Sequence, residues 1–226
     1  MKDRSVGILG LGNRSTLFYI DELNKKFNAL FKGYSTCPFI LYNINFEKVN
    51  PYLPNQFNKL TPLLTLYIND IKRLGINFLL IPNITLHEAI DKIYTDLDVA
   101  HPVQLTMVKL IDCELTEAVI FGSLYTMQST YLKNSFQQNK ILLIEPKMED
   151  QKFLEYFREQ IYYERETEMD LKEYNRLLIF YSKDHPLLIA CTELSICTSQ
   201  MELNIFDMAA LQIENTIALF QTKKND

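Results

Sequence analysis

A cysteine, a threonine and a glutamate stand side by side where an apolar run of the sequence ends. The run, residues 187–191, reads LLIAC, and Thr192 and Glu193 follow it directly. A thiol and a carboxylate can both move protons near neutral pH when their surroundings shift their pKa values. A lone cysteine here is also an ordinary small buried residue. A helix that begins at Cys191 favours chemistry, because its dipole stabilises a thiolate.

Small polar residues also follow three other apolar runs. These segments are GLGNRST from residue 10, PNITLHE from residue 82 and GSLYTM from residue 122. Each is expected to open a helix, and the unpaired amide groups of a helix start bind carboxylate or phosphate. Taken alone, TLHE also fits a capping box in which Thr85 and Glu88 are purely structural. The four ends together predict a site for a small polyanion, and its candidate binding residues are Asn13, Ser15, Thr16, Thr85, Ser123, Thr126, Thr192 and Glu193.

The elements that position these residues are short apolar runs alternating with longer stretches of helical period. This alternation predicts an α/β fold of parallel strands covered by helices. Strands are predicted at residues 6–10, 39–43, 78–82, 99–103, 118–122, 141–145 and 187–191. Helices are predicted at residues 16–32, 61–75, 85–97, 104–112, 126–138, 149–166, 169–183 and 206–222. The helix at 61–75 has the clearest limits, with Thr61 as its cap and Gly75 as its stop.

The length of 226 residues permits one large domain or two compact halves. No Pro-, Gly- or Ser-rich linker divides the chain, but each half is a run of strands and helices. We place the boundary near residues 96–101, and the right-handed crossover rule then predicts three-layer α/β/α sandwiches. In such open sheets, ligands bind beyond the carboxyl ends of the strands.

Composition excludes several classes of partner. The formal charge is −5, and no cluster of Lys and Arg rises above the background, so nucleic acid is not an expected partner. No run approaches 18 apolar residues and the N-terminus lacks a signal-peptide core, so we expect no membrane association and a cytosolic location. These features predict a globular protein that acts on a small molecule.

Cofactor and metal sites are not indicated. The four cysteines form no CxxC pair and have no histidine at metal-ligand spacing, which argues for free thiols and against zinc. The glycines of GILGLG lack the G-x-G-x-x-G phase, and the strand FILYN ends in Asn43 rather than an acidic residue, which argues against nicotinamide binding.

Several segments resemble the aspartate/glutamate racemase family of cofactor-independent enzymes. They are VGILGLGNRST, FLLIPNITLHEA, VIFGSLYTM, IEPKMEDQKFLEYFREQI, LLIACTEL and the closing IFDMAALQIENTIALF. Their order and approximate spacing match the family along nearly the whole chain. The C-T-E triplet and the G-S/T-x-x-T-M run are the more specific of these motifs.

The resemblance implies two α/β/α domains, residues 1–98 with 206–226 and residues 99–205, related by a pseudo-two-fold axis with the active site in the cleft between them. It also implies a homodimer and no cofactor. Members of the family racemise amino acids with two bases on opposite faces of the substrate Cα, usually two cysteines. The second cysteine matches Cys191, with Thr192 and Glu193 completing its motif.

The first cysteine of the family has no counterpart here. Asn83 occupies its position, and Ile84 replaces an asparagine that holds the substrate carboxylate in the family. An amide has no titratable proton near neutral pH and cannot serve as a general base. Gln212 stands where many members have histidine, whereas Asp207 is retained. The basic residue that would hold a distal carboxylate is open, with Lys48, Arg165 and Lys172 as candidates by position.

Three functions are compatible with these residues. The first is a racemase or epimerase for aspartate or glutamate in which Thr85 or a water replaces the missing base. The second is a single-cysteine reaction like that of arylmalonate decarboxylases, where loss of CO2 forms the carbanion that Cys191 protonates. The third is a non-catalytic protein that binds an amino or dicarboxylic acid or serves as an interaction module. Retention of Cys191 favours the first.

Overall fold

The protein consists of two compact units, each built on one parallel sheet. The computed structural model describes residues 5–198 and 204–221. Unit 1 comprises the chain up to His101 together with the segment from Gln212 onward, and unit 2 comprises Pro102–Leu211. Each unit holds a four-stranded sheet whose strands all pair in parallel. The predicted α/β class with two parallel sheets is confirmed, and the exact domain limits stay a prediction.

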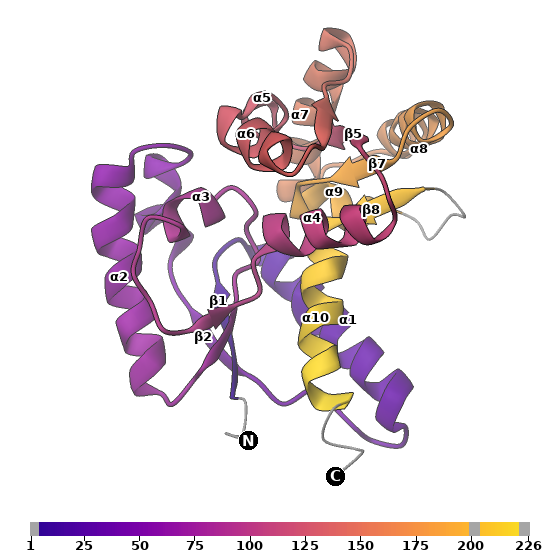
Figure 1. Ribbon diagram of the computed structural model, residues 1–226. Coiled ribbons are helices and arrows are strands. Elements are labelled where there is room, and N and C mark those ends of the chain that lie inside the picture. Colours follow the sequence, from indigo (N-terminus) through magenta and orange to yellow (C-terminus); the bar gives the residue numbers. More distant parts are fainter. Residues whose placement is uncertain (1–4, 199–203, 222–226) are drawn as a thin grey trace. The chain divides into compact units, whose positions relative to one another are not determined.

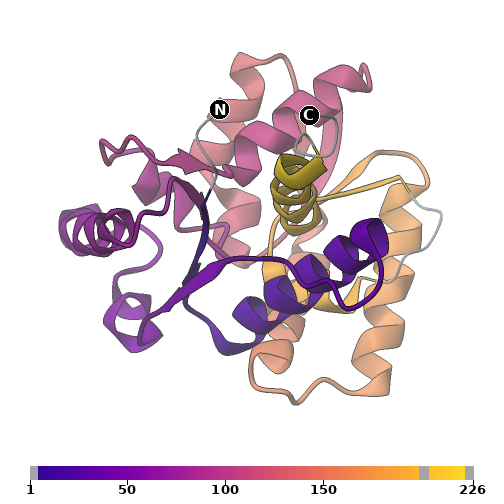
Figure 2. The same ribbon diagram turned by 90° about the horizontal axis from the view of Figure 1, so that it is seen from below.

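Unit 1 has three layers. Its sheet has the strand order β2-β1-β3-β4, with β1 (Val6–Gly10), β2 (Ile40–Asn43), β3 (Phe78–Leu80) and β4 (Asp98–Val99). Its helices are α1 (Asn13–Phe31), α2 (Phe57–Arg73), α3 (His87–Ile90), the 3-10 turns η1 (Phe46–Lys48) and η2 (Asn50–Tyr52), and most of α10 (Met208–Gln221). In both ribbon views α2 lies on one side of the sheet and α1 with α10 on the other (Figures 1 and 2).

Unit 2 repeats the same strand order. Its sheet runs β6-β5-β7-β8, with β5 (Glu117–Phe121), β6 (Leu142–Ile144), β7 (Leu187–Ile189) and β8 (Ile205–Asp207). Its helices are α4 (Pro102–Asp112), α5 (Leu124–Gln128), α6 (Thr130–Gln138), α7 (Met148–Tyr162), α8 (Glu168–Ser182) and α9 (Thr192–Cys197). In each sheet the first strand of the unit is therefore central, between the second and the third.

The central strands are buried on both faces because helices cover both. Every residue of β1, β3 and β7 is buried. In unit 2, the alternate residues Val119 and Phe121 of β5 face a cluster with Leu154 and Phe157 of α7. Polar side chains have no place along such strands, since a buried polar group without a partner costs free energy. The first positions open to chemistry come after the strands end.

A glutamine stabilises the interior of unit 1. Gln212 of α10 is fully buried, accepts a hydrogen bond from the Tyr19 hydroxyl of α1, and donates one to the carbonyl of Ala100 at 2.6 Å. Both of its polar ends are thus satisfied, and they join α1 and α10 to the segment after β4. At the position where many racemases have histidine, this chain has a residue with a structural function.

Several predicted elements differ from the structure. The strand predicted at 99–103 is wrong beyond Val99, because α4 begins at Pro102 and proline suits a first helical turn. The helix predicted at 61–75 begins earlier, at Phe57, and Thr61 is no cap: its hydroxyl donates to the Phe57 carbonyl. Gly75 has φ of 77° and follows the helix end, as predicted.

Two further helices are divided or shortened. The helix predicted at 126–138 is two helices, α5 and α6, because Ser129 is extended and caps α6 with its side chain. The helix predicted at 85–97 is limited to the single turn of α3. The short strand β8 was not predicted, since its residues were assigned to the start of the last helix or left outside any element. No described helix is long and apolar enough to cross a membrane.

Replacing Gln212 by alanine should destabilise the protein by about 2–4 kcal/mol, because the buried Ala100 carbonyl and the Tyr19 hydroxyl would each lose the hydrogen bond to this side chain. Urea denaturation measures the difference in free energy of unfolding. The matched control is Gln221→Ala at the exposed end of the same helix, which should change stability by less than about 0.5 kcal/mol. Equal effects of the two changes would contradict the role of Gln212.

Candidate active site

The residues after β7 place a thiol beside a carboxylate. Cys191 is extended, with φ −151° and ψ 123°, and is the N-cap residue of α9. Its Sγ donates a hydrogen bond to Oε2 of Glu193 at 3.1 Å. Glu193 is half-buried, so the pair lies at the margin of the core. The predicted helix start at Cys191 is present, and the proton of the thiol has an acceptor.

The thiol of Cys191 is held in its neutral form. Burial is the largest cause, with 7% of the residue exposed, and the charge of Glu193 adds to it. Arg158 and the amide of Leu194 act in the opposite direction, but the pKa of Cys191 remains well above its ordinary value. The resting site is therefore a thiol that can donate a proton, and it becomes a base only when its proton moves to Glu193 or another acceptor.

The turn after β5 lies against the end of β7. Ser123 caps α5 by accepting from the Thr126 amide at 3.1 Å, and the two hydroxyl oxygens are 2.7 Å apart. A side chain at Gly122 would come within 3.0 Å of Thr126 Cβ and 3.3 Å of the Ala190 carbonyl oxygen. Glycine thus allows this turn to approach the residue just before Cys191. The structure brings Ser123 and Thr126 to the same end of the sheet as the C-T-E triplet.

Thr192 has an unused hydroxyl. The residue is 3% exposed, and among the described residues its Oγ1 has no hydrogen-bond partner. A buried hydroxyl normally finds a partner. Thr192 directly follows Cys191 in the chain, and its assignment as a binding residue stays a prediction.

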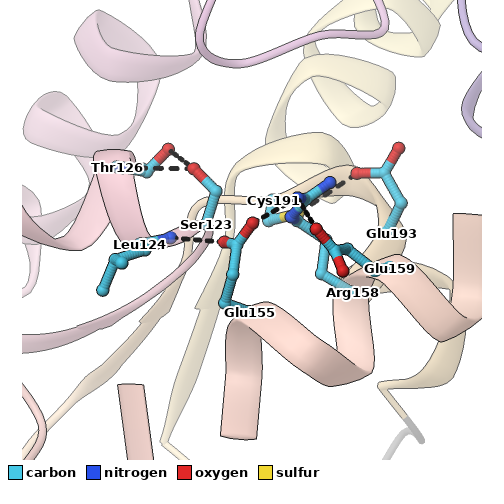
Figure 3. Close-up of polar contacts among 8 residues, drawn as sticks. All are labelled: Ser123, Leu124, Thr126, Glu155, Arg158, Glu159, Cys191 and Glu193. Carbon is cyan, nitrogen blue, oxygen red and sulfur yellow. Dashed lines mark hydrogen bonds and ion pairs between the residues drawn. The ribbon is translucent and has the colours of Figure 1, made fainter. Parts of the chain in front are cut away.

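An arginine and a glutamate of α7 complete this site, and the sequence analysis missed both as site residues. Figure 3 shows Arg158 beside Cys191, with Glu155 and Glu159 around its guanidinium. Glu155 forms an ion pair with Arg158 through one oxygen, and its other oxygen accepts from the Leu124 amide at 2.6 Å. Burial alone would raise the pKa of Glu155, but these two hydrogen bonds lower it below its ordinary value. Glu155 is therefore ionised and joins Arg158 to the first turn of α5.

One signal in the sequence marks Arg158. On a helix, Arg158 lies one turn from both Leu154 and Ile161, which are fully buried. A charged residue that shares a face with core residues requires a nearby charge of opposite sign. The side chain of Arg158 is only 24% exposed. The pattern was visible in LEYFREQI, but the sequence alone does not reveal which strand end this face approaches.

In unit 1, the residue at the position that the resemblance assigns to a first cysteine serves local structure. Asn83 follows β3, and its side-chain oxygen accepts from the Leu86 amide at 3.0 Å. Ile84 is buried, with 6% exposed. The amide oxygen of Asn83 thus caps the turn that leads into α3, and Ile84 contributes to packing. The capping box proposed for Thr85 and Glu88 is wrong, because the residue before α3 is Leu86 and no side chain caps the helix there.

The other predicted residues of unit 1 lie at the end of the neighbouring strand. Asn13 is exposed in the first turn of α1, whereas Ser15 and Thr16 are buried. Thr16 Oγ1 accepts from the Leu11 amide at 3.1 Å and so supports the glycine turn. Thr85 is half-buried after β3. Because β1 and β3 are adjacent and parallel, all four residues lie at the same edge of the sheet.

The proposed cations for a distal carboxylate are all exposed. Lys48 lies in η1, Lys172 lies in α8, and Arg165 stacks 5.3 Å from the ring centre of Tyr163. None of them is packed against a described polar site, in contrast to Arg158. Within residues 5–198 and 204–221, no group of three His, Cys, Asp or Glu side chains is arranged to bind a metal.

His87, which matches a histidine of the motif that carries the resemblance, is a buried neutral imidazole. Its Nδ1 is 2.9 Å from the carbonyl oxygen of Asn83, so this nitrogen carries the hydrogen. Its ring packs edge to face against that of His101, with 4.9 Å between the ring centroids. Burial, and secondarily His101, lowers the pKa of His87 to about 3 despite the opposing hydrogen bond. This histidine is not a proton carrier at neutral pH.

Solved structures that superpose on this chain include aspartate racemases or their homologues and a maleate isomerase. The chain superposes on an aspartate racemase homologue from Pyrococcus horikoshii with a TM-score of 0.81 and 18% identity, covering 96% of this chain and 99% of that one. The chain superposes on an aspartate racemase from Picrophilus torridus with a TM-score of 0.74 and 19% identity, covering 96% of this chain and 99% of that one. With the maleate isomerase Iso from Pseudomonas putida the TM-score is 0.58 and the identity 8%, covering 96% of this chain and 92% of that one.

No protein-family model matches the sequence, and no curated protein matches it. These superpositions cover nearly the full length of both the chain and the solved structures, so the chain shares their α/β fold in both units. More particularly, it has the fold of the aspartate racemases. At these identities the likeness defines the fold, and the chemistry must be argued from the site.

The free energy of unfolding should fall as pH decreases from about 6.5 to about 3. The pKa of His87 is lower in the folded than in the unfolded state, so the unfolded state binds the extra proton in this window, and stability changes by up to about 1.4 kcal/mol per pH unit. His87→Asn keeps a donor toward the Asn83 carbonyl and removes the titration. Urea denaturation between pH 4 and pH 7 should show a shallower slope for the variant; parallel curves would contradict this role.

Proposed function

We propose that the protein is a cofactor-independent isomerase of the racemase type that acts on aspartate or glutamate through the Cα proton. The observation that carries this proposal is the hydrogen bond from Cys191 to Glu193 at the end of β7, near the half-buried Arg158. The fold, shared with aspartate racemases, supports it.

The chemistry follows from which groups of the site can give up or accept a proton. Glu193 takes the thiol proton of Cys191, the resulting thiolate removes the Cα proton, and the same sulfur can return it. The unpartnered Thr192 hydroxyl and the Ser123–Thr126 turn supply donors for the substrate carboxylate. Each transfer conserves the proton among sulfur, carboxylate and Cα, and none requires a cofactor.

Position 83 limits what one thiol can accomplish. The Asn83 amide does not titrate, and its oxygen already accepts from the Leu86 amide. Exchange of the Cα proton on one face is therefore the basic reaction, and inversion requires a proton from water or from Thr85. The homodimeric state and cytosolic location stay predictions from the sequence.

The protein should exchange the Cα proton of L- or D-aspartate or glutamate in D2O, as followed by proton NMR. Cys191→Ser should slow exchange by about a hundred-fold or more, since that is what a positioned general base contributes. Cys197→Ser, at a half-buried cysteine of the same helix, is the matched control and should retain the rate.

The outcomes separate the candidate functions. Exchange with inversion supports a racemase, and exchange with retention supports chemistry by one base. If none of the four amino acids exchanges, the racemase proposal is wrong; CO2 release from arylmalonates then identifies a decarboxylase, and calorimetric binding without turnover identifies a binding protein. Unchanged exchange in Cys191→Ser would remove the thiol from the reaction.

Asn83→Cys should raise the ratio of inversion to exchange, because the resemblance assigns this position to the base that would act opposite Cys191. Loss of the cap on the Leu86 amide should cost about 1 kcal/mol of stability. Chiral chromatography of the amino acid product measures inversion, and Asn83→Ser, which keeps a capping oxygen but supplies no base, is the control. Equal inversion by the two variants would contradict a catalytic position at residue 83.

A further inference from the structure

Arg158 is a half-buried cation whose Nε atom is buried and whose hydrogen-bonding capacity is incompletely used. Its Nη2 pairs with Glu155 and lies 3.7 Å from Oε1 of Glu159. Its Nε is buried and, within the described ranges, has no hydrogen-bond partner. Arginine at this depth usually satisfies its whole fork. An open donor on a held guanidinium points to a negative group that the resting site lacks.

The charges around Arg158 identify where that negative group would form. Arg158 interacts electrostatically with Cys191 and Glu193 as well as with Glu155, and Figure 3 places its side chain beside the thiol. The lowered pKa of Glu155 makes it an anion before any reaction begins, whereas the raised pKa of Cys191 keeps the thiol neutral. The group near Arg158 that can gain a negative charge during proton transfer is therefore the sulfur.

A second buried group also lacks a partner at this strand end. The Thr192 hydroxyl, on the residue that follows Cys191 in the chain, has no partner among the described residues, although only 3% of the residue is exposed. Two buried groups without partners, one on α7 and one on α9, thus belong to residues at this end of β7. Donors that face a developing charge stabilise it.

We propose that Arg158 is a positioning residue for Cys191: its guanidinium stabilises the thiolate form of the sulfur, and Glu155 holds the guanidinium in place. This deepens the proposed function, since it states how a buried thiol becomes a base. The carboxylate of Glu155 also competes for the guanidinium, so it both fixes Arg158 and moderates its effect. Removing the charge at position 155 releases the cation toward the sulfur.

The reactivity of Cys191 toward iodoacetamide tests this proposal without any amino acid. The thiolate sulfur forms a bond to the methylene carbon of the reagent while the carbon–iodine bond breaks and iodide leaves, so the rate follows the thiolate fraction. Peptide mass spectrometry from pH 7 to pH 9.5 gives the rate for Cys191 and, in the same molecules, for Cys197 as the internal reference. The result does not depend on whether the protein exchanges α-protons.

Arg158→Met should slow alkylation of Cys191 relative to Cys197 about five- to tenfold and move its pH profile upward, since tenfold corresponds to one pKa unit. Arg158→Lys, which keeps the charge, should recover most of the rate. Arg176→Met is the matched control: Arg176 also pairs with a glutamate three residues earlier, but on the exposed face of α8, and its loss should leave the ratio unchanged.

Glu155→Gln should increase the rate of Cys191 alkylation relative to Cys197 about two- to threefold. This variant provides the test if circular dichroism shows that Arg158→Met is unfolded. Unchanged or faster alkylation in folded Arg158→Met, or unchanged or slower alkylation in Glu155→Gln, would overturn the proposal. Loss of α-proton exchange with the alkylation ratios as expected would instead count against the proposed function and leave the role of Arg158 intact.

Discussion

Strands that are buried on both faces leave no room for a polar side chain, and this constraint decides where each unit can do chemistry. The residues of β1, β3 and β7 are all buried and apolar or glycine. Because the strands of each sheet run parallel, their carboxyl ends share one edge, and the polar residues of the turns gather there. The triplet after β7, the Ser123 turn after β5 and the Asn83 turn after β3 all follow from this rule.

The two sheets use equivalent positions in different ways. β3 and β7 each stand between the first and the fourth strand of their sheet, and Asn83 and Cys191 follow them. The oxygen of Asn83 is engaged with a backbone amide, and the sulfur of Cys191 is engaged with a carboxylate. One position is therefore committed to holding its own turn, whereas the other retains a titratable proton. Of these two equivalent positions, only the one in unit 2 carries a titratable side chain.

The sequence predicted the features that depend on local patterns. The runs at β1, β5 and β7 were located to within two residues, because strands covered on both faces are continuously apolar. The Cys191–Thr192–Glu193 triplet could be recognised because its residues are contiguous and directly follow such an apolar strand. The prediction failed where neighbours compete: Ser129 caps a new helix, and the Thr95 hydroxyl accepts from the Leu97 amide where a helix was expected. Arg158 depends on tertiary packing, which no local pattern reveals.

Glu155 has a consequence for how the site can be observed. One of its oxygens holds the guanidinium beside the sulfur, and the other holds the amide of Leu124. A change in the charge of the sulfur alters how strongly Arg158 draws on this carboxylate, and the hydrogen bond at the opposite oxygen must respond. We therefore expect the nitrogen-15 chemical shift of the Leu124 amide to report the ionisation of the thiol.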